Sequence, residues 1–223
     1  MTEEMTESMR QAMSLDGDRQ KLESFYAQWA ATYDADVADH GYGLPRSMVA
    51  ALMSAIDVLA AADPSHRTLV ESNSVVLDAA CGTGQVGVAL HAAGYQVIDG
   101  IDLSAEMVAV ARTTGVYRRL EAGIDLTENP PEHLLAHADV MTVGGVFTVG
   151  HIPPESLRRM SKMVKPGGLM VVSTRKAYQD DTGFADVSSA LIEEGVFQLV
   201  LRQADQPYTM DSTGDYWVYR LPQ

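Results

Sequence analysis

An aspartate and three glycines form the strongest chemical signal in the chain. Asp78 follows a short apolar run, residues 75–77, and Gly82, Gly84 and Gly87 come after it as a helical pattern begins. Glycines permit positive φ and let a ligand approach the backbone, and the helix that follows offers unpaired N–H groups. The pattern therefore predicts a binding site at a turn between a strand and a helix. The alternative is a tight turn that binds nothing.

The charges of two aspartates indicate which ligand such a site would bind. The glycine spacing alone also matches a dinucleotide fingerprint. However, the carboxylate of Asp78 would repel a pyrophosphate and would suit a cation, such as a ligand's ammonium group. Asp102 ends the next apolar run, and neighbouring strand ends of a doubly wound sheet open onto one crevice. Asp102 could accept hydrogen bonds from two ribose hydroxyls there, or it could cap the helix that begins near Ser104.

Aromatic residues form a third group, at helical spacing near the N-terminus. This stripe predicts a helix, and its aromatic face either packs on the sheet or closes over the binding site as a lid. Gly41 and Gly43 end the helical pattern. The stripe consists of Leu22, Phe25, Tyr26, Trp29 and Tyr33.

Few other side chains suit catalysis or metal binding. His133 and His137 have the spacing of a metal pair, but prolines precede them and no third ligand is evident, so we expect a solvated loop and no metal site. His151 follows the fourth strand, on the edge where ligands bind, and is the candidate general base. Its alternative role is to stabilise the turn before Pro153. Cys81 is expected to be inert packing within the glycine loop.

Apolar runs that alternate with amphipathic helices must position these residues. Such alternation predicts a parallel sheet covered on both faces, and the last two runs, with no helix between them, predict an antiparallel hairpin. The expected fold is α/β, a seven-stranded, Rossmann-like, mostly parallel sheet with a C-terminal hairpin and an N-terminal helical lid. The expected strands are 75–77, 95–101, 120–124, 140–143, 169–173, 196–202 and 216–221.

Composition bounds the domains and the partners. We expect residues 1–19 to be a disordered or frayed tail and residues 20–223 to be one domain, with the lid at 20–45. The 223 residues include 16 Lys and Arg against 30 Asp and Glu, a formal charge of −14, which disfavours nucleic-acid binding. We find no run of 18 apolar residues and no signal peptide, so no membrane span and a cytoplasmic location are expected. The expected state is a monomer or homodimer.

The motifs together resemble class I S-adenosylmethionine-dependent methyltransferases over roughly residues 22–221. The sequence D-A-A-C-G-T-G at 78–84 is similar to the first motif of that superfamily, I-D-L-S at 101–104 to its second, and K-P-G-G at 165–168 to the turn into its fifth strand. Residues 25–46, 115–120 and 172–175 resemble more closely the methyltransferase-like group of the Williams–Beuren syndrome region. Residues 145–151 resemble related bacterial enzymes.

The resemblance implies a role for each matching residue. Asp78 and the glycines would surround the methionine part of the cofactor, Asp102 would hold the ribose, and Asp125 would face the adenine amino group. The implied cofactor-binding residues are Tyr33, Asp78, Ala80, Gly82, Gly84, Asp102, Leu103, Met107, Ile124, Asp125, Val143 and Val146. The lid or substrate residues would be Tyr26, Trp29 and Tyr42.

The expected function is methyl transfer from S-adenosylmethionine to an oxygen or nitrogen of a small molecule, with S-adenosylhomocysteine as product. A protein acceptor is the nearest alternative. Two other classes stay open: a protein that binds the cofactor without catalysis, and an NAD-dependent oxidoreductase, which the charge of Asp78 disfavours.

Overall fold

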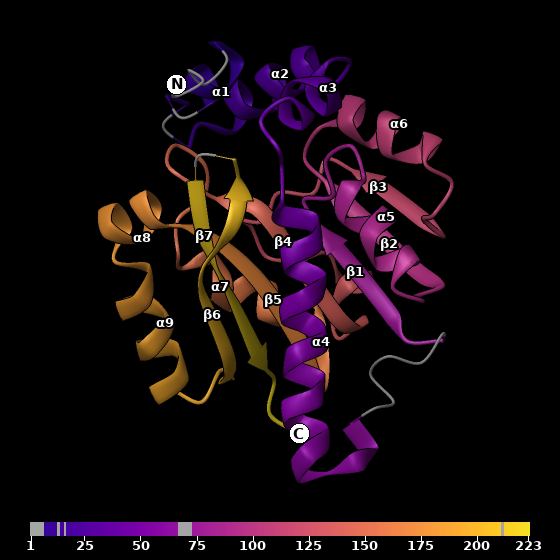
Figure 1. Cartoon of the computed structure of the whole chain (residues 1–223), viewed down its shortest axis with the longest axis vertical. Coiled ribbons are helices and arrows are strands. Elements are labelled where there is room, and N and C mark those ends of the chain that lie inside the picture. The colour runs from indigo at the N-terminus through magenta and orange to yellow at the C-terminus, as the bar shows by residue number, and fades with distance from the viewer. Residues whose placement is uncertain (1–6, 13, 16, 67–72, 211) are drawn as a thin grey trace.

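The computed structural model describes residues 7–12, 14–15, 17–66, 73–210 and 212–223. Its described part contains one seven-stranded sheet with the strand order β3-β2-β1-β4-β5-β7-β6 (Figure 1). The strands are β1 (Val75–Ala79), β2 (Val97–Asp102), β3 (Arg119–Ala122), β4 (Ala138–Phe147), β5 (Val164–Arg175), β6 (Gln198–Thr209) and β7 (Ser212–Arg220).

The pairing of the strands confirms the predicted fold class. Strands β1 to β5 are mutually parallel, whereas β7 runs antiparallel to both β5 and β6. The parallel strands all end at one edge of the sheet, so the loops that follow β1, β2 and β4 gather there. The predicted C-terminal hairpin is β6 and β7.

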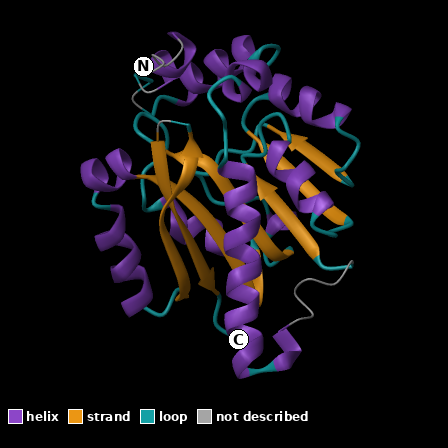
Figure 2. Cartoon of the chain, in the orientation of Figure 1, coloured by secondary structure: helices purple, strands orange, loops and turns teal. Residues whose placement is uncertain are grey.

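Helices cover both faces of the sheet (Figure 2). One hydrophobic cluster packs α4 (Leu44–Ala62) and α5 (Gln85–Ala92) against Val76 and Val140. The other packs α7 (Ser156–Ser161) and α9 (Phe184–Glu193) against Leu77 and Met141. The helices are α1 (Glu7–Ala12), α2 (Arg19–Trp29), α3 (Tyr33–Ala38), α4 (Leu44–Ala62), α5 (Gln85–Ala92), α6 (Ala105–Thr113), α7 (Ser156–Ser161), α8 (Lys176–Thr182) and α9 (Phe184–Glu193), with a short 3-10 turn η2 (Glu132–Leu134).

Helix α4 is long and strongly apolar, although the sequence led us to expect no membrane span. By length and composition alone it could cross a membrane, with a mean hydropathy of 1.4. Its Leu44, Met48, Leu52 and Ile56 are, however, fully buried against the sheet. Packing on the sheet therefore accounts for the apolar character of this helix.

The N-terminal segment is packed over the sheet edge rather than frayed where the structure describes it. Residues 1–6 of the expected tail lie outside the described residues. Ala12 and Leu15 are buried, and the Gly17 N–H donates a 2.9 Å hydrogen bond to the Gly150 carbonyl in the loop after β4. Helices α1 to α3 thus lie across the edge where the parallel strands end (Figure 1). Because only a few residues make these buried contacts, the sequence shows no sustained apolar stripe here.

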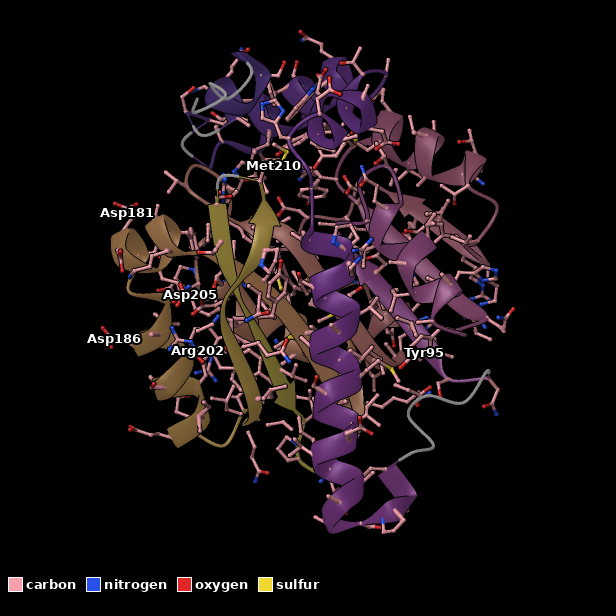
Figure 3. All side chains as sticks on the ribbon, in the orientation of Figure 1. Tyr95, Asp181, Asp186, Arg202, Asp205 and Met210 are labelled. Carbon is pink, nitrogen blue, oxygen red and sulfur yellow. The ribbon has the colours of Figure 1, made fainter. Side chains whose placement is uncertain are left out.

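The C-terminal hairpin also reaches the N-terminal helices. Met210, at the tip between β6 and β7, donates its N–H to the carbonyl of His40 at 2.8 Å (Figure 3). The Gly43 N–H likewise donates to the Tyr208 carbonyl at 2.9 Å. The segment before α4 is therefore held at both the hairpin and the loop after β4.

Candidate active site

A cavity lies at the carboxyl edge of the parallel strands, beneath α2 and α3. Its walls come from the N-terminal segment, the glycine loop after β1, the loops after β2 and β3, and the end of β4. The lining residues are Gly17, Arg19, Leu22, Tyr26, Tyr33, Tyr42, Ala80, Cys81, Gly82, Thr83, Gln85, Val86, Asp102, Leu103, Met107, Ile124, Asp125, Leu126, Thr127, Gly144, Gly145, Val146, His151 and Ile152.

The cavity brings together most of the residues that the sequence predicted for a site. Those that line it are Tyr26, Tyr33, Tyr42, Ala80, Gly82, Asp102, Leu103, Met107, Ile124, Asp125, Val146 and His151. Four predicted residues do not line it: Trp29, Asp78, Gly84 and Val143. The reason differs for each of the four.

Asp78 lies beneath the glycine loop, not in the cavity, and this corrects the expected contact with a ligand's cation. Its side chain is buried, with 1% exposed, and each carboxylate oxygen accepts a hydrogen bond from a side chain. Tyr117 donates to Oδ2 at 2.7 Å and Thr142 donates to Oδ1 at 2.9 Å. Burial raises the pKa of Asp78 from 3.8 to about 6, although both hydrogen bonds oppose the rise.

The second and third glycines of the motif make room for Tyr117. Gly84, at φ +96°, immediately precedes α5, and a Cβ there would lie 3.0 Å from the Tyr117 ring. A Cβ on Gly87 would overlap the Tyr117 hydroxyl, and one on Gly100 of β2 would come within 2.9 Å of the same ring. These glycines therefore serve the packing of Tyr117, which holds Asp78. Gly84 itself does not face the cavity.

Gly82 is the glycine of the motif that is open to a ligand. At φ +53° it has nothing within 4 Å of the position where a Cβ would be. Its N–H donates to Oδ2 of Asp102 at 2.8 Å, while the Ser104 N–H donates to Oδ1 at 2.9 Å. Asp102 thus joins the ends of β1 and β2, and burial raises its pKa. Ser104 caps α6 through its own hydroxyl, which leaves Asp102 free of that role.

Val143 and Trp29 belong to the protein interior. Val143, in the middle of β4, is fully buried in the core. The Trp29 Nε1–H donates to Asp36 at 2.6 Å, and its ring packs edge-on to that of Tyr33 with 4.8 Å between the centroids. Trp29 therefore supports Tyr33, which does line the cavity.

One end of the cavity combines apolar side chains with the carboxylate of Asp125, which hydrogen bonds fix in place. Leu103, Met107 and Ile124 supply the apolar wall. Oδ1 of Asp125 accepts hydrogen bonds from the Thr127 N–H at 2.8 Å and from its hydroxyl at 2.7 Å. Oδ2 of Asp125 lies 3.7 Å from Nε of Arg19 at the start of α2. A flat ring with polar edges would fit between these groups.

The opposite end contains His151, whose tautomer follows from its two partners. Nδ1 lies 3.1 Å from the Val149 carbonyl, which can only accept, so Nδ1 carries the proton. Nε2 is then the acceptor for the hydroxyl of Tyr26 on α2, at 2.7 Å. His151 is 8% exposed, and burial together with the charge of Arg175 lowers its pKa.

Tyrosines surround this end of the cavity, and burial raises the pKa of each, so all stay neutral at pH 7. They are Tyr26, Tyr33, Tyr42 and Tyr208. Tyr42 and Tyr208 pack edge-on at 6.0 Å beside Gly145. Their faces and hydroxyls offer a neutral wall that attracts cations.

Several residues that line the cavity or lie beside it were not predicted from the sequence. Arg19 and Gly17 fall in the segment expected to be a tail, and Tyr208 lies in a hairpin far along the chain. Asp34 contacts the glycine loop from α3, through Thr83 and Gln85. The adjacency of Asp34 to the predicted Tyr33 was the only signal that could have pointed to it.

The histidine pair considered for a metal binds carboxylates instead. Nε2 of His133 lies 2.8 Å from Glu121 and Nε2 of His137 lies 2.8 Å from Asp99. Across the part of the chain that the structure describes, no group of three or more His, Cys, Asp or Glu side chains is arranged to hold a metal ion.

Comparison with known proteins agrees with this geometry. Residues 76–168, from β1 into β5, match a family described as "Methyltransferase domain". Human methyltransferase-like protein 27 is 33% identical over 172 residues, which cover 77% of this chain and 64% of the relative. The chain therefore contains a methyltransferase domain over residues 76–168. The predicted resemblance is thereby confirmed.

Two further proteins, one curated relative and one solved structure, are similar to this chain. Ubiquinone biosynthesis O-methyltransferase of Yersinia pestis (strain Pestoides F) is 34% identical over 103 residues, 44% of this chain and 41% of that protein. The chain thus spans less than two thirds of the length of either curated relative. The crystal structure of the [4+2]-cyclase SpnF has the same fold, with a TM-score of 0.64, 17% identity and coverage of 93% of this chain and 97% of that one.

Proposed function

We propose that this protein transfers a methyl group from S-adenosylmethionine to an oxygen or nitrogen of a small-molecule acceptor. The observation that carries the proposal is the order of groups along the cavity. Gly82, Asp102 and the apolar wall around Leu103 follow one another on consecutive loops of a methyltransferase domain. These groups suit an amino acid, a ribose and an adenine joined in that order.

The residues present fit the cofactor. Gly82 leaves open space at the loop. Each oxygen of Asp102 accepts one backbone hydrogen bond and keeps a lone pair for a ribose hydroxyl. When bound, S-adenosylmethionine supplies a methyl group on a positively charged sulfur, and the protein's part is to bind, orient and exclude water.

The cover over the cavity favours a small acceptor over a protein. Helices α2 and α3 close the cavity from above, and Tyr26 reaches across it to His151. A folded protein would have to displace this cover to present a side chain. The name of the Yersinia relative, an O-methyltransferase of ubiquinone biosynthesis, is consistent with a small hydroxyl-bearing acceptor.

The position of Asp78 removes the charge argument against an NAD-dependent oxidoreductase. Asp78 does not face the cavity, so its charge does not discriminate against NAD. The match of residues 76–168 to a methyltransferase domain now disfavours the oxidoreductase. Cofactor binding without methyl transfer is the remaining alternative, and SpnF, described as a cyclase, shares the fold.

Calorimetry followed by an activity assay tests the proposal. We expect S-adenosylhomocysteine to bind and NADH not to, and ligand at about 100 times its dissociation constant to stabilise the fold by about 2.7 kcal/mol. S-adenosylhomocysteine formation is then measured with hydroxyl- and amine-bearing small molecules. A stability increase with NADH alone would overturn the proposal, and binding without turnover on any acceptor would favour the non-catalytic alternative.

A further inference from the structure

Asp34 contacts the glycine loop from the N-terminal helices. It lies on the first turn of α3, and its Oδ1 accepts two hydrogen bonds from that loop. The hydroxyl of Thr83 donates one at 2.5 Å, and the amide Nε2 of Gln85 donates the other at 2.7 Å. Thr83 and Gln85 flank Gly84, and both line the cavity.

These two bonds decide what the glycine loop offers to a ligand. A threonine hydroxyl has one proton, and that of Thr83 points to Asp34, so the oxygen can only accept from the cavity. The Gln85 amide turns its nitrogen to Asp34, which leaves its Oε1 as an acceptor with no partner in the described part of the chain. The loop therefore presents acceptors where a free hydroxyl and amide could equally have donated.

The ammonium group of a bound amino acid needs such acceptors. Asp78, the residue expected to meet it, is committed to Tyr117 and Thr142 below the loop. Tyr33, next to Asp34 in the chain, lines the same cavity. Its aromatic face adds attraction for a cation.

We propose that Asp34 is a positioning residue that orients Thr83 and Gln85 to accept hydrogen bonds from the ammonium group of the cofactor's amino acid part. The inference rests on the proposed function, because it presupposes that the cofactor binds in this cavity. It assigns to a side chain of α3 the task that the sequence assigned to Asp78. Asp34 acts through its two partners and touches the cofactor only by way of them.

A comparison of two ligands on three proteins tests this role. The ligands are S-adenosylhomocysteine and its desamino analogue, in which hydrogen replaces the ammonium group. The proteins are the wild type, Asp34→Ala and Asp34→Asn, with Asp39→Asn as control because Asp39 is an exposed carboxylate just beyond α3. Calorimetry gives each dissociation constant, and far-ultraviolet circular dichroism verifies folding.

We expect the wild type to prefer S-adenosylhomocysteine, and Asp34→Ala to weaken its binding by about 10- to 100-fold, the usual range for hydrogen bonds to a charged group. The desamino analogue should bind both proteins within a few-fold. The amide oxygen that Asp34→Asn introduces can accept the same two bonds. This variant and the Asp39→Asn control should therefore keep most of the preference.

Equal losses for both ligands in Asp34→Ala would overturn the inference, because Asp34 would then only hold α3 on the loop. A loss in Asp34→Asn as large as in Asp34→Ala would also overturn it, since the charge and not the orientation would matter. A folded wild type that binds neither ligand would instead overturn the proposed function, on which the inference depends.

Discussion

Tyr26 donates a 2.7 Å hydrogen bond to Nε2 of His151 from a position 125 residues earlier in the chain. The bond joins α2 to the loop after β4 across one end of the cavity. Because Nδ1 of His151 faces the Val149 carbonyl, both ring nitrogens already have partners. If His151 acts as the general base, a proton from an acceptor would reach Nε2 by way of the Tyr26 hydroxyl.

Substitutions at the two residues should therefore have similar effects. We expect His151→Ala and Tyr26→Phe each to lower turnover by about 10²- to 10⁴-fold, the usual effect of losing a general base. Affinity for S-adenosylhomocysteine should stay within a few-fold, and His91→Ala, at an exposed position of α5, should have no effect. A parallel loss of cofactor affinity, or a rate near that of the wild type, would assign the pair to structure.

The pH dependence of turnover gives a second measurement on His151. Burial lowers its pKa below the usual 6.5, so the ring stays neutral, and able to accept a proton, to lower pH than an exposed histidine would. The rate should therefore decline only as the pH falls below about 6.5. A decline that begins well above this pH would show that another group governs the reaction.

Asp78 should make stability fall as the pH rises from about 4 to 6. Its folded-state pKa of about 6 exceeds the unfolded value of 3.8, so between these values the folded chain binds more protons than the unfolded chain. The difference corresponds to about 3 kcal/mol at most. Asp78→Asn should match the wild type in urea unfolding near pH 4 and exceed it near pH 7. A constant difference across this range would contradict the assignment.

Asp102→Ala tests the ribose contact. The variant should weaken S-adenosylhomocysteine binding by about 1.5–3 kcal/mol, the scale of charge-assisted hydrogen bonds. Its fold should survive, because the residue ends a strand, with a modest loss of thermal stability from the unpaired N–H groups of Gly82 and Ser104. If the folded variant bound S-adenosylhomocysteine as tightly as the wild type, the role of Asp102 would be only to join the loops after β1 and β2.

Hydrogen exchange tests the lid. We expect amides of residues 22–40 to exchange more slowly with S-adenosylhomocysteine than without it, because closure over a ligand excludes water. Residues 48–56 of α4, where Met48, Leu52 and Ile56 are buried in the core, provide the internal control. Equal and slow exchange in both states would identify α2 and α3 as ordinary core helices.

The sequence pattern predicted the fold and most of the residues that line the cavity. It could do so because apolar runs, amphipathic helices and glycine turns each depend on residues that are close together in the chain. The expected strands captured the buried centres of β4 and β5 but not their ends, where residues such as Val164 and Thr174 join through sheet pairing. The expected position of Asp78 was wrong because the side of the loop on which it lies depends on Tyr117, 39 residues later. Contacts between distant segments leave no period in the sequence.

Two contacts of α2 would have a kinetic consequence if this helix acts as a lid, because both fasten it over the cavity. Arg19 faces Asp125, and Tyr26 donates a hydrogen bond to His151, with both residues on α2. A rigid helix cannot release one of these contacts while it stays fixed at the other, so cofactor and acceptor would then exchange through one shared opening step. We therefore expect the two products to leave in the same opening step, so that slower release of one is accompanied by slower release of the other.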